Sequence, residues 1–134
     1  MKSPDGRYEL VMHDFWEVRM GSPIFGRIEI LGGEVDTSGE FGEPAAFSPD
    51  SRFLATEELV DALSGLHTRV VVFGLERRRR IIIHDLNPGC IRGFHWFEGG
   101  VLTFETWSPV TGERQLSWQA PPPRPKGLLK NLFG

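Results

Sequence analysis

The sequence predicts an all-β fold built from short antiparallel strands. Sixteen glycines and ten prolines divide its 134 residues into short segments, several of them rich in β-branched and aromatic residues. A Ser-Pro-Asp turn motif occurs at residues 3–5 and again at 48–50, and each copy leads directly into such a segment. Proline suits the first central position of a turn, and an aspartate side chain bonds nearby backbone groups, so both motifs predict turns that open strands.

Eight segments are expected to form strands. In the first, Tyr8, Leu10 and Met12 occupy alternate positions, which is typical of a strand with one face in the core. The expected strands are residues 7–13, 25–31, 52–58, 69–73, 79–84, 91–97, 101–107 and 113–118.

Two of these segments are continuous apolar runs. Residues 70–73 and 81–83 contain only apolar side chains, mostly β-branched, which predicts strands covered on both faces. Residues 76–78 are expected to join them as a hairpin. The arginines at 77–80 resemble a basic patch, but we interpret them as a polar turn that leads into the next strand. Residues 32–44 are interpreted as a turn-rich loop.

Residues 56–65 allow two interpretations. Thr56, Glu57 and Gly65 suit the cap, first turn and end of a short helix, whereas the apolar residues just before them continue a strand. We favour a strand to about Glu58, followed by a loop or a single helical turn. The segment after residue 120 holds three consecutive prolines and cannot join a sheet, because proline lacks the backbone donor.

The turn motif belongs to an internal repeat. Residues 3–10, SPDGRYEL, recur 45 positions later as residues 48–55, SPDSRFLA, and residues 94–102 form a degenerate copy without the Pro and Asp. A period of about 45 residues is in the range of four-stranded propeller blades. The segments FSPDSRFLA (47–55) and TRVVVFGL (68–75) resemble the blade motif of WD40-like, PD40-type repeats in bacterial β-propellers. This resemblance covers about 110 residues and implies antiparallel, blade-like sheets.

The chain is too short for a closed propeller. Propellers close with about 4–8 blades, and residues 1–120 provide fewer than three repeats of this length. The alternatives are an open stack of two to three blade-like sheets, a single curved sheet, or a dimer that completes a ring. Edges or an apolar face then remain for a second copy or another protein to cover. We therefore expect one all-β domain at residues 1–120 and a Pro-rich basic tail at 121–134.

The charge of the expected domain favours some partners over others. The net charge is −3, but the last 14 residues hold three of the 15 basic residues and none of the 18 acidic ones, which leaves −6 on residues 1–120. An acidic domain repels nucleic acid, is compatible with a basic protein partner, and also keeps a small protein soluble. Apolar runs stay well below the roughly 20 residues that cross a bilayer, and the N-terminal residues do not resemble a signal peptide. A cytoplasmic protein without a membrane partner is expected.

Known catalytic motifs are not found in the sequence. It contains no Gly-rich phosphate loop, G-x-S-x-G elbow or H-E-x-x-H motif. Cys90 follows Pro88 and Gly89 in an expected turn, and we interpret it as a buried or neutral thiol. The four histidines and the scattered acidic groups are interpreted as surface or hydrogen-bonded residues. We expect no enzyme activity, no cofactor and no bound metal.

Aromatic residues beside acidic ones give the candidate contact residues. Trp16 lies in the segment DFWE at residues 14–17, and Trp107 ends a later expected strand. Tryptophan at such a position is typical of a binding hot spot, although most tryptophans of a small β fold are core residues, as we expect for Trp96 and Trp118. Acidic residues at the matching position of the second repeat are expected to share a face with the first group. The candidate partner-binding residues are Asp14, Trp16, Glu17, Glu57, Glu58, Asp61 and Trp107.

These observations lead to a protein-binding hypothesis. Its most concrete form is a bacterial immunity protein that neutralises a basic toxin domain by direct binding. The alternatives are a structural homo-oligomer that completes a propeller, a homodimer included, and a hydrolase whose site the motifs do not reveal.

Overall fold

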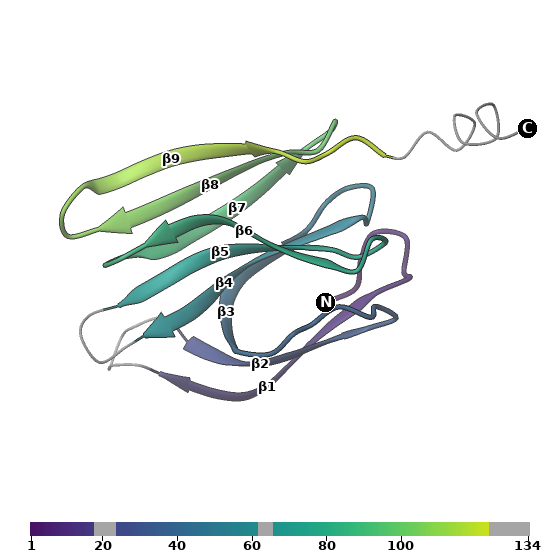
Figure 1. Ribbon diagram of the computed structural model, residues 1–134, viewed down its shortest axis with the longest axis horizontal. Helices are drawn as coiled ribbons and strands as arrows, with labels where there is room; N and C mark the ends of the chain where they lie inside the picture. Colours follow the sequence, from purple (N-terminus) through teal and green to yellow (C-terminus); the bar gives the residue numbers. More distant parts are fainter. Residues whose placement is uncertain (18–23, 62–65, 124–134) are drawn as a thin grey trace, which may run out of the picture.

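Nine antiparallel strands form two sheets in the computed structural model, which describes residues 1–17, 24–61 and 66–123 (Figure 1). The first sheet has six strands in chain order and the second has three. The described residues contain no helix, and therefore none long and apolar enough to cross a membrane. The expected all-β, antiparallel fold is confirmed. The strands are β1 (Glu9–Glu17), β2 (Ile24–Leu31), β3 (Glu40–Phe47), β4 (Phe53–Asp61), β5 (His67–Gly74), β6 (Arg79–Leu86), β7 (Cys90–Phe97), β8 (Val101–Ser108) and β9 (Gly112–Gln119).

The strands are arranged in three layers (Figure 1). β1 and β2 form the lower layer, β3 to β6 the middle layer, and β7 to β9 the upper layer. The ladder between β2 and β3 contains only the pairs Phe25–Gly42 and Gly26–Phe41. Because so few pairs join the two strands, the six-stranded sheet can bend there and carry β1 and β2 over the face of β4 and β5.

Each pair of layers encloses a hydrophobic core. The lower core contains Tyr8, Leu10, Ile28, Ile30, Phe41, Leu54, Val71, Phe73 and Leu75. The upper core contains Phe53, Ala55, Val70, Val72, Leu86, Ile91, Trp96, Leu102, Phe104 and Ala120. β5 supplies alternate side chains to both cores, so all four residues of its apolar run are fully buried, as predicted. Trp96 is buried in the upper core, as expected, and Trp118 is half-buried against it.

The same prediction is wrong for the second apolar run. β6 is an edge strand of the six-stranded sheet, and the Ile82 side chain on it is 51% exposed. A run of β-branched residues indicates a strand but does not distinguish an edge from a central position.

Strand β3 was not expected, because Gly42 and Pro44 made its segment resemble a loop. The ladder between β3 and β4 shifts its register between Gly42 and Ala45, and Pro44 lies within this bulge. A proline in a bulge does not interrupt the backbone pairing on either side. β4 continues as a strand to Asp61, so the strand interpretation of residues 56–58 is confirmed. The loop or helical turn expected directly after Glu58 is wrong for residues 59–61, and residues 62–65 lie outside the described residues.

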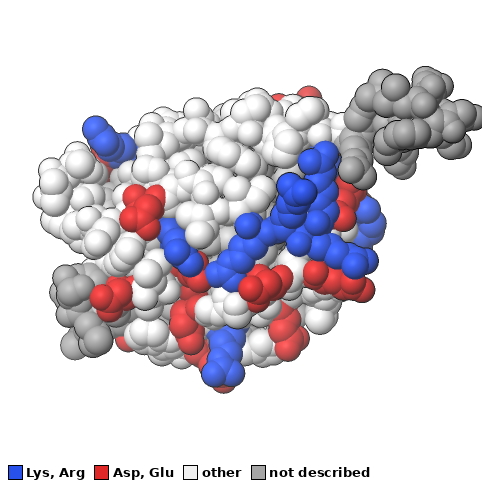
Figure 2. Space-filling model, in the orientation of Figure 1, with Lys and Arg blue, Asp and Glu red and all other residues white. Residues whose placement is uncertain are grey.

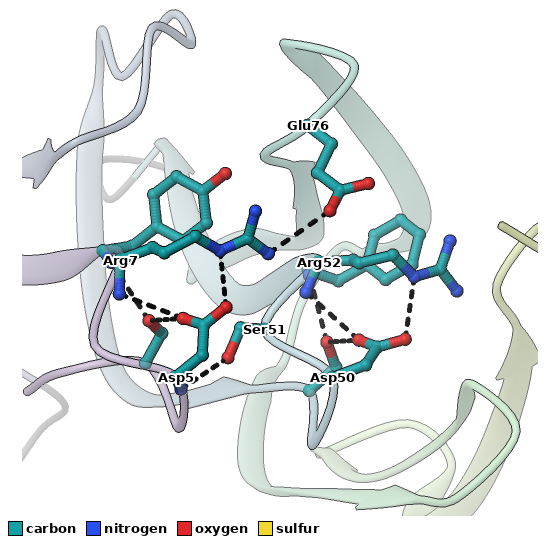
Figure 3. A network of polar contacts seen from close by, with 10 residues as sticks. Asp5, Arg7, Asp50, Ser51, Arg52 and Glu76 are labelled. Carbon is teal, nitrogen blue, oxygen red and sulfur yellow. Dashed lines mark hydrogen bonds and ion pairs between the residues drawn. The ribbon is translucent and has the colours of Figure 1, made fainter. Parts of the chain in front are cut away.

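The two Ser-Pro-Asp motifs form matching turns that lie side by side (Figure 3). In the second turn, Ser48 Oγ donates to Asp50 Oδ1 (2.7 Å) and accepts a hydrogen bond from the Phe53 N–H (3.0 Å). The first turn repeats both bonds, with Ser3 as the serine. The N–H of Asp5 donates to Ser51 Oγ (3.0 Å), which joins the two turns directly. The sequence repeat is therefore also a structural repeat.

The aspartates of these turns are held in their charged form. Backbone and side-chain hydrogen bonds from Arg7 lower the pKa of Asp5 to about 2. Bonds from Arg52 and Ser48 lower the pKa of Asp50, although its partial burial opposes them. In each turn the arginine also lies over the next aromatic ring, Tyr8 in the first case and Phe53 in the second. Each turn is thus fixed by charge and by ring contact.

Ser48→Ala is expected to destabilise the fold by about 1–2 kcal/mol, because it removes the acceptor of a buried N–H. Ser48 is 1% exposed. Ser3→Ala should have a similar effect, since the bonds are equivalent. Urea unfolding of both variants would measure this, with Ser117→Ala on the exposed side of β9 as the control. An equal change in all three variants would contradict the assigned role.

The third, degenerate copy also forms a hairpin turn. Residues 98–100 connect β7 to β8, and Gly99 and Gly100 both adopt positive φ angles, 82° and 79°. This turn lies beside the second Ser-Pro-Asp turn, because residues of both line one shallow groove. The Trp96 Nε1–H donates to the Ala46 carbonyl (2.9 Å) and ties β7 to β3. The expected hairpin at residues 76–78 is confirmed. Residues 121–123 join no strand, and residues 124–134 lie outside the described residues. In Figure 2, basic side chains gather beside acidic ones toward the right of the molecule.

Candidate functional site

A bulge near the end of β1 sets the geometry of the candidate site. The β1–β2 ladder shifts its register between His13 and Trp16, and Asp14 within the shift adopts a positive φ of 52°. On β2, Gly26 faces this bulge closely, because a Cβ atom there would lie 2.4 Å from the His13 carbonyl oxygen. The bulge therefore needs a glycine opposite it. Such bulges typically redirect side chains near functional sites.

Three large apolar side chains are exposed around this bulge. Phe15 is 54% exposed, Trp16 41% and Ile24 44%. In the β1–β2 ladder, Trp16 lies opposite Phe25 and Glu17 lies opposite Ile24. Because successive pairs point to opposite faces, Ile24 shares a face with Glu17, and Trp16 points to the other face. Single exposed apolar residues are ordinary, but three of them at the ends of two paired strands make this end of β1 and β2 a candidate contact site.

Phe15 and Trp16 border two different grooves. Phe15 contributes to a largely apolar groove of about 450 Å³, whose lining is Met1, Leu10, Met12, Phe15, Glu43, Pro44 and Ala45. The Trp16 indole N–H donates to Glu40 Oε2 (3.3 Å). Glu40 in turn lines a polar groove of about 760 Å³, together with His13, Asp14, Arg27, Ile28, Glu29, Thr37, Ser38 and Gly39.

Acidic side chains surround these aromatic residues. Asp14, Glu17 and Glu43 are exposed, and Glu40 is half-buried. Within the described residues, no ion pair neutralises any of these four carboxylates, whereas His13 pairs with Glu29 at 3.6 Å. We call Asp14, Phe15, Trp16, Glu17, Ile24, Glu40 and Glu43 together the β1–β2 end surface.

The structure brings together only some of the candidate residues. Asp14, Trp16 and Glu17 lie on the β1–β2 end surface. Glu57 and Glu58 are 0% and 6% exposed, so the predicted shared face does not include them. As neighbours on β4, the two side chains point to opposite faces of the middle layer, Glu57 toward β7 and Glu58 toward the lower core. The sequence did not reveal this, because adjacent charged residues in a strand usually indicate an exposed segment.

The two remaining candidates lie elsewhere. Asp61 is half-buried at the end of β4, where its backbone pairs with His67. Trp107 lies in the three-stranded sheet, with the Arg92 guanidinium 5.9 Å from its ring centre. Because β8 belongs to the upper layer and β1 to the lower one, Trp107 does not extend the surface around Trp16.

Other members of the β1–β2 end surface were missed by the sequence analysis. Phe15 and Ile24 were not singled out, although Phe15 directly precedes Trp16. Glu40 and Glu43 were placed in a loop, whereas β3 carries them to the site. Recognising β3 in the sequence would have provided the missing signal.

Buried ionisable groups between the sheets form a separate cluster. Glu57 Oε2 accepts a hydrogen bond from the Ile91 N–H (2.7 Å) at the start of β7, but no described residue bonds Oε1. Burial raises the pKa of Glu57 to about 7. Burial also raises the pKa of the nearby half-buried Cys90 thiol, and the negative charge of Glu57 adds to this. The described residues hold no group of three or more His, Cys, Asp or Glu arranged for a metal ion.

Comparisons of the chain with protein-family models, with curated proteins and with solved structures found no match. The resemblance to propeller blades therefore stays a prediction.

Proposed function

We propose that this chain is a protein-binding module and that the β1–β2 end surface is its contact surface. The carrying observation is the exposure of Phe15, Trp16 and Ile24 on one strand pair, around a bulge that needs Gly26. Partly exposed aromatic residues supply much of the affinity in protein interfaces, since burying them removes a large apolar area from water.

The charges around these residues indicate the chemistry of the partner. Asp14, Glu17 and Glu43 are exposed carboxylates next to the aromatic pair. A partner segment with Lys or Arg beside an apolar side chain complements both features. The apolar side chain would enter the groove beside Phe15, and the basic groups would meet the carboxylates. A basic toxin domain is one partner of this chemistry, and neutralising it remains the most concrete form of the proposal.

The arrangement of the repeats supports this function over ring completion. We interpret β3 to β6 as one four-stranded blade, flanked by shorter blade-like units that begin with the first and third turns. In a repeat stack, polar outer faces end the array. The outer face of β1 and β2 carries His13, Arg27 and Glu29, which does not suit stacking of a further apolar blade.

Trp16→Ala is expected to weaken partner binding by about 30-fold or more, the effect of losing a hot spot. The test begins by capturing proteins on the immobilised chain and purifying the captured partner. Calorimetry then measures its affinity for each variant. Phe97→Ala provides a matched control, because Phe97 is 48% exposed on the other sheet. A loss of affinity with Phe97→Ala but not with Trp16→Ala would contradict the proposed surface.

The acidic residues should act mainly on the association rate. Charges at the rim of an interface guide encounter, and this guidance weakens as salt concentration rises. Replacing Asp14 and Glu17 with Lys should slow association with a basic partner and reduce its salt dependence. Unchanged association kinetics would show that the partner is not recognised by its basic charge. Protection of cells that express a toxin, lost with Trp16→Ala, would support the toxin-neutralising form.

A further inference from the structure

β9 is an open edge of the three-stranded sheet and lies on the upper outline of the molecule (Figure 1). The Ala120 N–H donates to the Gly100 carbonyl (2.8 Å), and the register continues from there along β8. Backbone groups of an antiparallel strand point alternately to its two sides. The N–H and C=O groups of Glu113, Gln115 and Ser117 therefore point away from β8, to a side where the described residues place no strand.

The other strand edges carry features that block pairing. β7, the second edge of the three-stranded sheet, shifts its register between Ile91 and Gly93. At the outer edge of β1, the Leu10 N–H donates to the Met1 carbonyl (2.7 Å), and the bulge at Asp14 follows. β6 begins with two arginines and is bulged opposite Val70. The β8–β9 ladder differs, because it has eight pairs without a register shift and β9 contains no proline. A regular exposed edge of this kind is a template for another strand.

We propose that β9 pairs with β9 of a second copy of this chain, antiparallel, about a two-fold axis at Leu116. This dimer joins the two three-stranded sheets edge to edge and is independent of the β1–β2 end surface. Its interface consists of backbone hydrogen bonds in which Gln115 pairs with Ser117 of the other copy and Glu113 pairs with Gln119 of that copy.

The side chains of β9 are self-complementary in this register. Leu116 lies opposite Leu116 of the second copy, and Arg114 lies opposite Trp118 of that copy. The aliphatic stem and the guanidinium of Arg114 then both contact the half-buried indole of Trp118. On the other face, Gln115 lies opposite Ser117 of the second copy. Like charges do not meet in this register. An axis at Arg114 would instead place two arginines opposite each other, which is destabilising.

A second copy binds more favourably at this edge than on the outer face of the three-stranded sheet. Face-to-face stacking would bury charged side chains of the outer face, such as Arg92 and Glu105, which are exposed. Edge pairing leaves those side chains in water and satisfies backbone groups instead. It also covers Leu116 and Trp118, which pack only partly against the upper core. The contact is small, which places the dimer among weak complexes.

Sedimentation equilibrium of the full chain tests the dimer from about 10 μM to about 1 mM, the range of weak complexes. The average mass should rise with concentration from 15.1 kDa toward twice that value. Ser117→Pro should stay monomeric and folded, since it removes a donor from the open side of β9. Phe97→Ala should dimerise like the original chain.

Three results of this experiment would overturn the proposal. They are a constant mass of 15.1 kDa throughout the range, an unchanged dimer in Ser117→Pro, and loss of the dimer in a chain that ends at Pro123. The last result would assign the association to residues 124–134 instead. Trp16→Ala should leave the dimer intact, which separates this inference from the function proposed above.

Cysteine cross-linking tests the position of the two-fold axis. In a Cys90→Ser background, Leu116→Cys should form a disulfide-linked dimer on oxidation. Directly opposed residues in antiparallel strands have Cα atoms about 4.5–5.5 Å apart, within the range of a disulfide. Arg114→Cys should not cross-link, because the axis places it opposite Trp118. Cross-linking through position 114 but not 116 would overturn the proposed register.

Discussion

Glu57→Gln is expected to make the chain about 3 kcal/mol more stable than the original at pH 8, and to change its stability little at pH 5. Glu57 is 0% exposed, and burial raises its pKa from the ordinary value of 4.5 to about 7. The folded chain therefore binds this proton more tightly than the unfolded chain. Stability is lost as the pH rises from about 4.5 to 7, because over this range the unfolded chain releases the proton whereas the folded chain keeps it.

Glutamine has the same shape as the protonated side chain and keeps an oxygen acceptor for the Ile91 N–H, but it never ionises. The pH dependence due to Glu57 should therefore disappear in Glu57→Gln. Urea unfolding at pH 5, 6, 7 and 8 measures the effect, with Glu29→Gln on the exposed face of β2 as the control. Parallel stability curves for the original chain and Glu57→Gln would contradict the prediction.

Other carboxylates act in the opposite direction below pH 4. Asp5 and Asp50 have lowered pKa values, because they accept hydrogen bonds in their turns. Their stabilising effect is present above the ordinary pKa and is lost as the pH falls toward the lowered one. The combined contribution of these three carboxylates to stability should therefore be greatest near pH 4–4.5, between the two effects.

The sequence was most informative where local chemistry determines the structure. The Ser-Pro-Asp motifs predicted their turns because one serine and one aspartate satisfy the same backbone groups in each copy. The apolar run on β5 predicted a strand buried on both faces. The run on β6 did not, because the position of a strand in its sheet depends on partners far away in the sequence.

The candidate site depended more on such distant contacts. Trp16 and its acidic neighbours were recognisable because they are consecutive in the sequence. Glu40 joins them only because β3 pairs between β2 and β4, and a proline within a bulge hid that strand. Glu57 and Glu58 resembled surface residues, whereas tertiary packing gives one a backbone donor and the other two arginines.

Glu58→Ala is expected to have the largest destabilising effect of the changes considered, about 3–5 kcal/mol, as for other buried ion pairs that lose one partner. The Glu58 side chain is 8% exposed and bonds Arg69 Nε at 2.5 Å and Arg80 Nη2. Together these residues connect β4, β5 and β6. Loss of the carboxylate leaves the Arg80 guanidinium, only 17% exposed, without its counter-charge.

Arg80 cannot easily move into water to relieve this charge. Its guanidinium donates to the Ser38 carbonyl (2.6 Å) and lies 5.0 Å from the ring centre of Phe41 and 5.8 Å from that of Phe73. Both rings belong to the lower core. Moving Arg80 into water would therefore expose core residues and break its hydrogen bond to the loop at Ser38. Glu58→Ala thus either keeps an uncompensated buried charge or loses packing in the lower core.

Thermal and urea unfolding of Glu58→Ala should show a melting temperature lower by about 10 °C or more. Glu34→Ala is the matched control, because Glu34 forms an ion pair of similar length with Arg78 (2.8 Å), but both side chains are more than 60% exposed. Exposed pairs of this kind contribute at most about 1 kcal/mol. Glu58→Gln keeps a hydrogen-bond acceptor, so its loss of melting temperature should lie between those of Glu58→Ala and Glu34→Ala. Equal losses in Glu58→Ala and Glu34→Ala would show that Glu58 does not anchor the three strands, because burial would then not distinguish the two pairs.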